Sequence, residues 1–120
     1  NVVILDAYNA NPDSMMAALQ NLRKMPERLK IAILGDMKEL GEYSAVEHAK
    51  VMDFGKEYKL DRVFGVGDDF KSVGVADCYG TIDELISILK KEPIQNAAVL
   101  IKGSRSMRME QLIKIKEIWN

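Results

Sequence analysis

Short apolar runs without polar alternation recur along the chain and are separated by longer segments of helical periodicity. The runs cover residues 2–5, 31–34, 62–66 and 97–101, and β-branched residues are frequent in them. Continuous apolar runs of this length are typical of strands that are buried on both faces of a parallel sheet. A weaker fifth strand is predicted over residues 73–79.

Helical patterns lie between and after these runs. The first helix is predicted to begin at Asn11, whose side chain can cap it, with Pro12 in the first helical position, where a missing N–H costs nothing. Its apolar stripe reaches Leu22, and Pro26 ends it.

The starts of two further helices are marked by the segments "SAVE" at residues 44–47 and "TIDE" at residues 81–84. Both match the capping-box pattern, in which a side chain and the backbone satisfy each other's free donors. A last helix is predicted over residues 106–119, with Leu112, Ile115 and Trp119 on one face.

This alternation of strands and helices predicts a single α/β domain over residues 1–120. Right-handed crossovers between parallel strands place helices on both faces of the sheet. We therefore expect a Rossmann-like three-layer domain with a mostly parallel sheet flanked by helices. The chain is long enough to bury a core of its own without disulfides or a structural metal.

Composition narrows the classes of partner. Hydrophobic residues make up 48% of the chain and charged residues 29%, which is ordinary for a globular domain. The formal net charge of -1 removes the usual electrostatic argument for nucleic acid or an anionic membrane as the main partner. No apolar run approaches the roughly 20 residues that span a bilayer, so no membrane insertion is expected. The single cysteine, Cys78, favours a reducing compartment, and we expect a cytoplasmic protein.

Ligands of open α/β sheets bind beyond the carboxyl ends of the strands, so the loops that follow the main runs are the candidate site. These loops cover residues 6–11, 35–43, 65–70 and 102–105. The third contains Gly-x-Gly, but Phe70 stands where a third glycine would complete a dinucleotide-binding fingerprint. No loop ends in Gly-Lys-Ser or Gly-Lys-Thr, so the chain has no phosphate-binding P-loop of its own.

The first loop, "DAYNANPDS", places many polar side chains directly after a strand. Asp6 can accept two hydrogen bonds from a ribose diol, and Asn9 can both donate and accept toward a base or a sugar. Asparagine and aspartate also favour turns, and Asn11 followed by Pro12 is a good helix start. The residues alone therefore support a polar small-molecule site and a simple turn about equally.

The fourth loop, "KGSR", joins a buried strand to a predicted helix start. Free backbone N–H groups and the helix dipole favour an anion there, and Gly103 lets the backbone approach it closely. Arg105 can hold a carboxylate or a phosphate with two parallel hydrogen bonds. The alternative is a capped helix with two solvated cations, Lys102 and Arg105.

Three segments, "DAYNANPDSMMAAL", "IAILGDMKELGEYSAVEH" and "LIKGSRSMRME", occur in this order along the chain. Together they closely resemble the carboxy-terminal domain of the Mur ligases, and the match spans nearly the whole chain. The form "YNANP" is typical of the members that add D-alanyl-D-alanine to UDP-N-acetylmuramoyl-tripeptide, whereas other members have a histidine-containing version.

The resemblance implies the third domain of a three-domain, ATP-dependent ligase of peptidoglycan precursor synthesis. In that family the first domain holds the UDP-sugar, and the central domain carries the P-loop and the Mg²⁺ sites. The start at Asn1, without a methionine, agrees with a domain cut from a longer protein. We expect this chain alone to be inactive, with no catalytic residue and no tightly bound cofactor.

The resemblance also implies roles for individual residues. The ATP-binding edge would comprise Asp6, Tyr8, Asn9 and Asn11. The residues expected to face D-alanyl-D-alanine are Asp36, Lys102, Gly103, Ser104 and Arg105. In the first set, Asp6 matches the position that bonds the ATP ribose. In the second, Asp36 would orient the attacking ammonium, unless it forms a salt bridge with a neighbouring lysine. His48 is expected to be a packing residue rather than a catalyst.

Two other functions stay open. The chain can be the corresponding domain of another Mur-type amino acid ligase, or a flavodoxin-like receiver or binding domain. A receiver needs clustered acidic side chains at strand ends, which Asp6, Asp36 and Asp68 can supply. The basic loop "KGSR" and the asparagine-rich first loop disfavour a receiver, because its chemistry requires neither.

Overall fold

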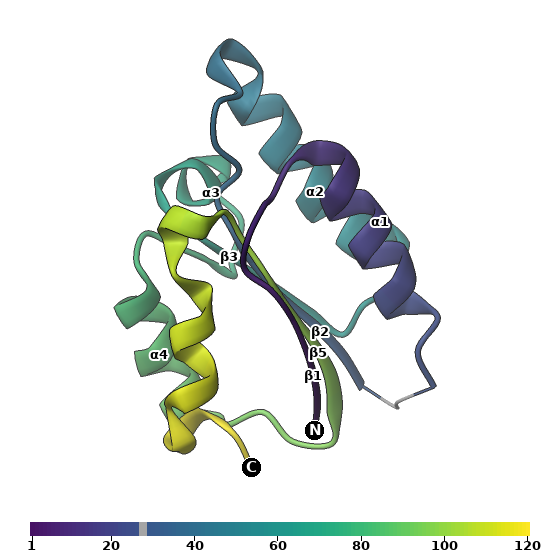
Figure 1. The fold of residues 1–120 in the computed structure, drawn as a ribbon, viewed down its shortest axis with the longest axis vertical. Coiled ribbons are helices and arrows are strands. Elements are labelled where there is room, and N and C mark those ends of the chain that lie inside the picture. The colour runs from purple at the N-terminus through teal and green to yellow at the C-terminus, as the bar shows by residue number, and fades with distance from the viewer. Residues whose placement is uncertain (27–28) are drawn as a thin grey trace.

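The computed structural model describes residues 1–26 and 29–120. Within them, one parallel sheet forms the middle layer, and its strands are ordered β1-β5-β2-β3-β4 (Figure 1). The strands are β1 (Val2–Asp6), β2 (Leu29–Gly35), β3 (Arg62–Val66), β4 (Cys78–Tyr79) and β5 (Ala97–Lys102). The predicted fold class and the main strands are confirmed, while the fifth strand is shorter than predicted.

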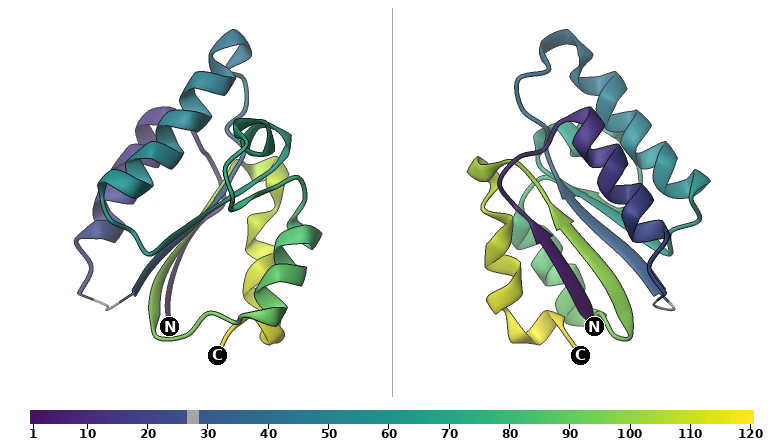
Figure 2. Two further views of the ribbon diagram at one scale, coloured as in Figure 1. Left: turned by 180° about the vertical axis from the view of Figure 1, so that it is seen from behind. Right: turned by 45° about the vertical axis from the view of Figure 1, so that its right-hand side comes forward.

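Helices cover both faces of this sheet. Figures 1 and 2 show α1 and α2 on one face and α4 with the carboxy-terminal segment on the other. The α-helices are α1 (Pro12–Arg23), α2 (Ser44–Glu57), α3 (Asp68–Val73) and α4 (Ile82–Lys91). The short 3-10 turns are η1 (Gly41–Tyr43), η2 (Arg105–Met107), η3 (Met109–Lys114) and η4 (Lys116–Ile118). None of the described helices is both long and apolar enough to cross a membrane.

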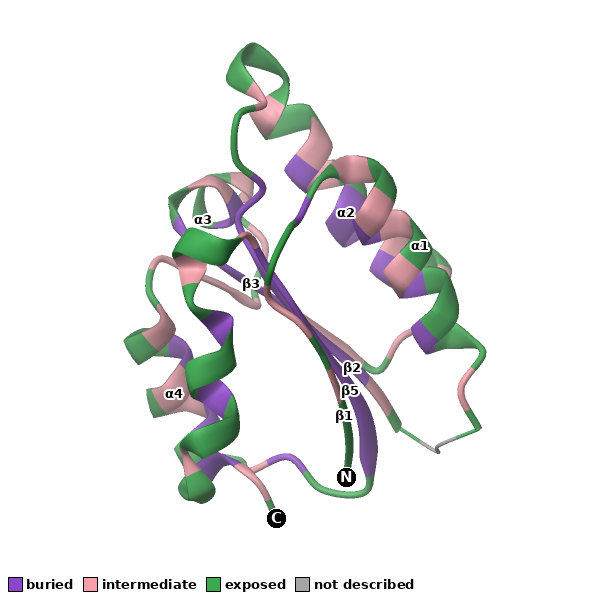
Figure 3. Ribbon diagram, in the orientation of Figure 1, coloured by how far each residue is buried: buried purple, intermediate pink, exposed green. Residues whose placement is uncertain are grey.

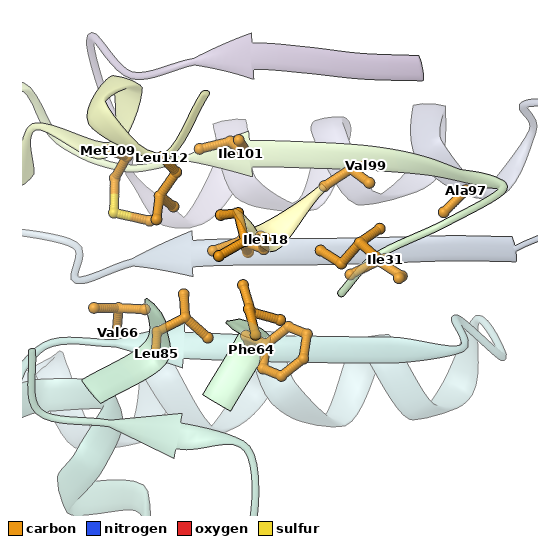
Figure 4. Close-up of a cluster of buried hydrophobic side chains, with 13 residues drawn as sticks. Ile31, Phe64, Val66, Leu85, Ala97, Val99, Ile101, Met109, Leu112 and Ile118 are labelled. Atoms are coloured by element: carbon orange, nitrogen blue, oxygen red, sulfur yellow. The ribbon is translucent and has the colours of Figure 1, made fainter. Parts of the chain in front are cut away.

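Strand β5 shows why the apolar runs lack polar alternation, because all of its residues are buried. Ala97, Val99 and Ile101 pack in the cluster beneath α4 and the carboxy-terminal turns, which Figure 4 shows in close-up. Ala98 and Leu100 belong to the opposite cluster, beneath α1 and α2. Successive side chains of a strand point to opposite faces, so a central strand of a three-layer domain is apolar on both. Figure 3 shows the buried residues concentrated on the sheet and on the inward sides of the helices.

The pairing register brings the loops at the carboxyl edge of the sheet together. Asp6 at the end of β1 pairs with Lys102 of β5, and Lys102 also lies opposite Leu34 of β2. Gly35 of β2 in turn pairs with Val66 of β3. These strands therefore end nearly level, and the loops that follow β1, β2, β3 and β5 share one edge of the sheet.

The predicted starts of the first three helices are confirmed, but their caps differ. At α1, the Asn11 side chain accepts a hydrogen bond of 2.9 Å from a first-turn backbone N–H. At α4, the Thr81 hydroxyl accepts a hydrogen bond of 3.2 Å from the Glu84 N–H. The Glu84 carboxylate accepts from the N–H of Gly80 instead of that of Thr81, so the capping box is only half formed. The capping box predicted at Ser44 is wrong. Turn η1 runs directly into α2, so Ser44 has helical angles of φ -56° and ψ -50° instead of the extended angles of a cap.

Two further helical predictions differ from the structure. The predicted carboxy-terminal α-helix is instead a series of 3-10 turns, because Arg108 has a left-handed φ of 51° and Ile115 is extended. Its predicted apolar face still meets the sheet, since Leu112 is fully buried there. Residues 65–70 are predicted as a loop, but α3 begins within them, at Asp68. This helix has 6 residues and one deeply buried apolar side chain, Phe70, so it gives little periodic signal in the sequence.

Candidate functional site

A cavity of about 580 Å³ opens among the loops at the carboxyl edge of the sheet, and we name it the rim cavity. Its walls come from the loops after β1, β2 and β5. They are formed by Asn9, Ala10, Asn11, Lys38, Glu39, Leu40, Ser104, Arg105 and Ser106. The structure therefore brings together residues from three of the four loops that the sequence marks as the candidate site.

Another hollow, of about 310 Å³, lies between α4 and the sheet, away from these loops. Apolar side chains such as Phe64 line much of it, and Arg62, one of its charged residues, donates hydrogen bonds of 3.1 and 3.2 Å to Asp77. The hydrogen bond to Asp77 raises the pKa of Arg62 above its ordinary value. The Arg62 charge is thus committed to a protein partner, and we place the candidate site at the rim cavity.

An ion pair joins the carboxyl ends of β1 and β5. Lys102 Nζ lies 2.5 Å from Asp6 Oδ2 and donates a second hydrogen bond of 3.0 Å to the carbonyl oxygen of Asn9. The Lys102 side chain is 3% exposed, whereas that of Asp6 is 46% exposed. A buried ammonium needs such partners, since an unpaired buried charge is strongly unfavourable. Asp6 keeps exposed carboxylate surface, and Lys102 fixes its position from inside the fold.

This pair joins two residues to which the resemblance assigns different ligands. Lys102 is expected to face the amino substrate, but its ammonium is directed at Asp6 and the first loop. Gly103, expected to offer its N–H to an anion, donates it to the carbonyl oxygen of Asp6 at 3.2 Å. A Cβ at Gly103 would also lie 2.7 Å from a side-chain atom of η3, so glycine is needed here for packing. In the fourth loop, Ser104 and Arg105 are the predicted residues that line the cavity.

Arg105 is accompanied by an aromatic ring from the first loop. Its Cζ lies 5.9 Å from the centroid of the Tyr8 ring, within the range of a cation–π interaction. Tyr8 is 74% exposed, and Arg105 is exposed as well. Among the described residues, no carboxylate pairs with Arg105. The predicted helix start at this loop is the single turn η2, which adds little dipole, so an anion here would depend on the guanidinium itself.

The two asparagines of the first loop have different surroundings. The Oδ1 atom of Asn11 accepts a hydrogen bond of 2.9 Å from the Ser14 N–H, and the Ser14 hydroxyl accepts one of 3.1 Å from the Asn11 N–H. Asn11 is therefore committed to the start of α1. Asn9 is exposed, and its side-chain amide makes no hydrogen bond with the described part of the chain. The Asn9 amide is thus available to a ligand.

Asp36 lies below the surface, with 2% of the residue exposed. Its two carboxylate oxygens accept hydrogen bonds of 2.9 Å from the backbone N–H groups of Asp69 and Phe70, in the first turn of α3. Burial raises the pKa of Asp36, and these two N–H groups oppose that rise by stabilising the charged form. No lysine pairs with this carboxylate among the described residues. Its geometry supports a structural role and gives no support to direct contact with an amine.

His48 is a packing residue, as predicted, and is fully buried. Its Nε2 accepts a hydrogen bond of 3.0 Å from the Met37 N–H, and its Nδ1 donates one of 2.7 Å to the carbonyl of Ser44. These contacts assign the neutral tautomer with the proton on Nδ1. His48 Nε2 also lies 3.9 Å from Asp36 Oδ1. Because backbone N–H groups already occupy the acceptor atoms of both residues, this cluster orders the loop after β2 rather than forming a metal site.

Residues 1–105 match the family model described as "Mur ligase, glutamate ligase domain". The chain belongs to the Mur ligase family. This Mur ligase domain is 37% identical over 115 residues to the UDP-N-acetylmuramoyl-tripeptide--D-alanyl-D-alanine ligase of Escherichia coli (strain K12), a match that covers 91% of the chain and 25% of that enzyme. The enzyme of the same name from Haemophilus influenzae is 36% identical over 123 residues, which cover 94% of the chain and 27% of that enzyme.

Solved structures agree with this assignment. A crystal structure of MurF from Acinetobacter baumannii has a TM-score of 0.76 and 33% identity, over 92% of this Mur ligase domain and 26% of that chain. MurF ligase from Thermotoga maritima, solved in complex with ADP, has a TM-score of 0.75 at 24% identity and supports the fold alone. The chain thus spans about a quarter of the length of these relatives. The predicted resemblance is confirmed.

Two residues of the rim cavity, Lys38 and Glu39, have no role in the sequence-based assignment. Both are exposed, and Glu39 has a left-handed φ of 61°. The sequence feature that could have indicated them is the loop "GDMKELG", whose two glycines predict a tight turn after β2 with charged residues exposed on it. The same pattern draws attention first to Asp36, because aspartate at a strand end is the more usual ligand position.

Proposed function

We propose that this Mur ligase domain is the carboxy-terminal domain of an ATP-dependent ligase that joins D-alanyl-D-alanine to UDP-N-acetylmuramoyl-tripeptide in peptidoglycan precursor synthesis. The observation that carries the proposal is the pair of Asp6 and Lys102, which joins the loop containing "YNANP" to the loop "KGSR" at one cavity. Relatives that are 36 and 37% identical to this chain are named for that reaction.

The proposed reaction forms an amide through an acyl phosphate. ATP phosphorylates the tripeptide carboxylate, the free amine of D-alanyl-D-alanine attacks that carbon, and phosphate leaves as the C–N bond forms and the nitrogen loses a proton. The chain has no Gly-Lys-Ser or Gly-Lys-Thr phosphate loop, so phosphoryl transfer is assigned to another domain. This domain would position the amine and the nucleotide in an oriented, water-shielded encounter when the domains close.

Asp6 is proposed to accept hydrogen bonds from the ribose hydroxyls of ATP. Its carboxylate is half exposed at the end of β1, and the buried Lys102 holds it in place. Tyr8, Asn9 and Asn11 would line the same nucleotide edge. Asn9 is the better placed of the two asparagines, because its amide is exposed while the Asn11 oxygen already caps α1.

Arg105 is proposed to hold the carboxylate of D-alanyl-D-alanine. Its guanidinium offers two parallel N–H donors, which match the two oxygens of a carboxylate. Ser104 lines the cavity beside it and supplies a hydroxyl donor. Lys102 and Gly103 would act indirectly, because their donors are bonded to Asp6 and keep the fourth loop against the first. Asp36 would act indirectly as well, through α3.

The other components of the proposed enzyme are two domains of a longer chain, one for the UDP-sugar and one for ATP and Mg²⁺. We assign Mg²⁺ to no residue of this domain, since the acceptor atoms of Asp36 and His48 are already bonded to backbone N–H groups. The enzyme is proposed to act in the cytoplasm, where ATP and nucleotide-linked precursors are available.

The test uses the full-length protein with ATP, Mg²⁺, UDP-N-acetylmuramoyl-tripeptide and D-alanyl-D-alanine. Phosphate release and amide formation that require every component would support the proposal. Turnover with a single amino acid, and not with the dipeptide, would assign the chain to another Mur-type ligase. The isolated chain should release no phosphate, and turnover by it would contradict the assignment of phosphoryl transfer to another domain.

A further inference from the structure

The rim cavity presents charges of both signs that no residue in the described part of the chain neutralises. Arg105 and Lys38 contribute cations to its lining, and Glu39 contributes an anion. All three residues are exposed, and none forms an ion pair with the residues that the structure describes. By contrast, the buried charge of Lys102 is paired with Asp6. Unpaired charges gathered around one cavity are therefore available to a ligand.

The acidic side chain of this cavity differs from the one expected at the amine. Asp36 is buried and bonded to the first turn of α3, so its oxygens face protein donors. Among the described residues that line the rim cavity, Glu39 is the acidic one. Glu39 follows Asp36 by three positions in the same loop. The carboxylate that is accessible to a ligand in this loop is therefore that of Glu39 and not that of Asp36 at the strand end.

The backbone holds Glu39 outward by anchoring the residues on either side of it. Met37 is 1% exposed and donates its N–H to His48, and Leu40 packs against the core cluster beneath α1 and α2. Glu39 itself has a φ of 61°, a left-handed conformation that is unfavourable for a residue other than glycine. This turn presents the side chains of Lys38 and Glu39 at the cavity while their neighbours remain packed.

We propose that Glu39 binds the ammonium group of D-alanyl-D-alanine and so positions the attacking nitrogen, while Arg105 on the fourth loop holds the carboxylate. This inference rests on the proposed function. A dipeptide carries a charge of each sign at neutral pH, so an anion and a forked cation on separate loops of one cavity match its two ends. A single contact would fix one end, whereas two contacts also fix the orientation of the nitrogen.

The test replaces Glu39 in the full-length enzyme. Glu39→Gln keeps the size of the side chain and removes its charge, and it should raise the KM for D-alanyl-D-alanine about tenfold. The KM values for ATP and for UDP-N-acetylmuramoyl-tripeptide should not change. Glu39→Asp, which retains the carboxylate, should recover part of the loss. Glu42→Gln is the matched control, because Glu42 is an exposed glutamate in η1 outside the cavity lining and its replacement should change no KM.

An analogue without the ammonium group separates binding from loop structure. D-lactoyl-D-alanine has a hydroxyl in place of the amine, and its inhibition constant against the dipeptide should be the same for wild type and Glu39→Gln. An inhibition constant that rises as much as the dipeptide KM would show that Glu39 supports the loop, and would overturn the proposal. An active Glu39→Gln enzyme with an unchanged dipeptide KM would overturn it too. A wild-type enzyme that does not use D-alanyl-D-alanine would refute the proposed function instead.

Discussion

Lys102 Nζ lies 2.5 Å from Asp6 Oδ2, although the two residues are 96 positions apart in the sequence. The parallel register of β1 and β5 places them side by side. Their environments differ, because 3% of the lysine side chain is exposed against 46% of the aspartate side chain. The ammonium depends on Asp6 to balance its charge, whereas water could solvate Asp6 without the lysine. Removing one partner or the other should therefore have different consequences.

Asp6→Ala should lower the free energy of unfolding by roughly 2 to 3 kcal/mol, because it leaves the buried ammonium without a countercharge. Lys102→Met fills a similar volume without a charge and should cost less than half as much. The double variant Asp6→Ala/Lys102→Met should recover most of the loss caused by Asp6→Ala. Urea denaturation followed by circular dichroism measures all three. Equal losses from the two single changes would contradict the asymmetry of the pair.

The same double variant isolates the role of Asp6 toward ATP, because it removes the carboxylate without leaving a buried charge. In the full-length enzyme it should raise the KM for ATP ten- to a hundredfold, the equivalent of about 1.5 to 3 kcal/mol for hydrogen bonds to a charged group. The KM for D-alanyl-D-alanine should barely change. Lys102→Met alone is the matched control. An unaltered KM for ATP would leave Asp6 with a purely structural role.

The sheet and the edge that carries the rim cavity were predictable from sequence because both depend on local patterns. Residues 97–101 are apolar throughout, and a strand buried on both faces requires this. The carboxyl ends of parallel strands share one edge, so the polar residues that follow β1 and β5 were expected along one rim. Asn9 and Arg105 line the same cavity because β1 also pairs with β5, a neighbour relation that the sequence did not predict.

The partners of individual side chains were not predictable, because they depend on distant segments. The sequence suggests Asp36 as a ligand-binding residue, but in the fold α3 presents two backbone N–H groups to its carboxylate. That helix is 6 residues long and too short to give a clear periodic pattern. The sequence also allows Lys102 to be a solvent-facing cation, whereas the register of β1 and β5 places Asp6 beside it. The left-handed φ of Arg108, which interrupts the last helix, is not signalled by its residue type.

Gly67 provides a test of the contact between Asp36 and α3. Its φ is 123°, and a Cβ there would lie 2.3 Å from Asp36 Cγ, so Gly67→Ala combines backbone strain with a clash. We expect the free energy of unfolding to fall by about 3 kcal/mol or more. Gly74→Ala is the matched control, because Gly74 has a φ of 80° with nothing within 4 Å of a Cβ, and it should cost about 1 kcal/mol. Similar losses in urea denaturation would show that Asp36 moves aside.

Cys78 should react slowly with iodoacetamide in the folded chain. Burial raises the pKa of its thiol from 9.0 to about 11, so the thiolate fraction at pH 8 should be roughly a hundredfold below that of the unfolded chain. The stabilising contribution of this shift is fully present below pH 9.0 and is lost as the pH rises through about 11. The Cys78→Ala variant should not show this loss of stability as the pH rises. Equal alkylation rates in native buffer and in urea would contradict the shift.

Arg105 should be needed for the carboxylate of the dipeptide, because its guanidinium lies at the rim cavity near the Tyr8 ring and pairs with no carboxylate of residues 1–26 and 29–120. Arg105→Lys keeps the charge and loses the fork, so the full-length enzyme should show a KM for D-alanyl-D-alanine raised about tenfold, with that for ATP little affected. Arg105→Ala should have a larger effect. Steady-state kinetics with each substrate varied in turn gives these values.

The amide of the dipeptide, D-alanyl-D-alanine-NH₂, distinguishes recognition of the carboxylate from support of the loop. It lacks the anion that a forked cation selects, so it should be a poor substrate for the wild-type enzyme. For the same reason, Arg105→Ala should reduce kcat/KM for the amide much less than for the acid. If Arg105→Ala lowers kcat/KM equally for the acid and the amide, Arg105 stabilises the loop after β5 or the closed arrangement of the domains, and another group holds the carboxylate.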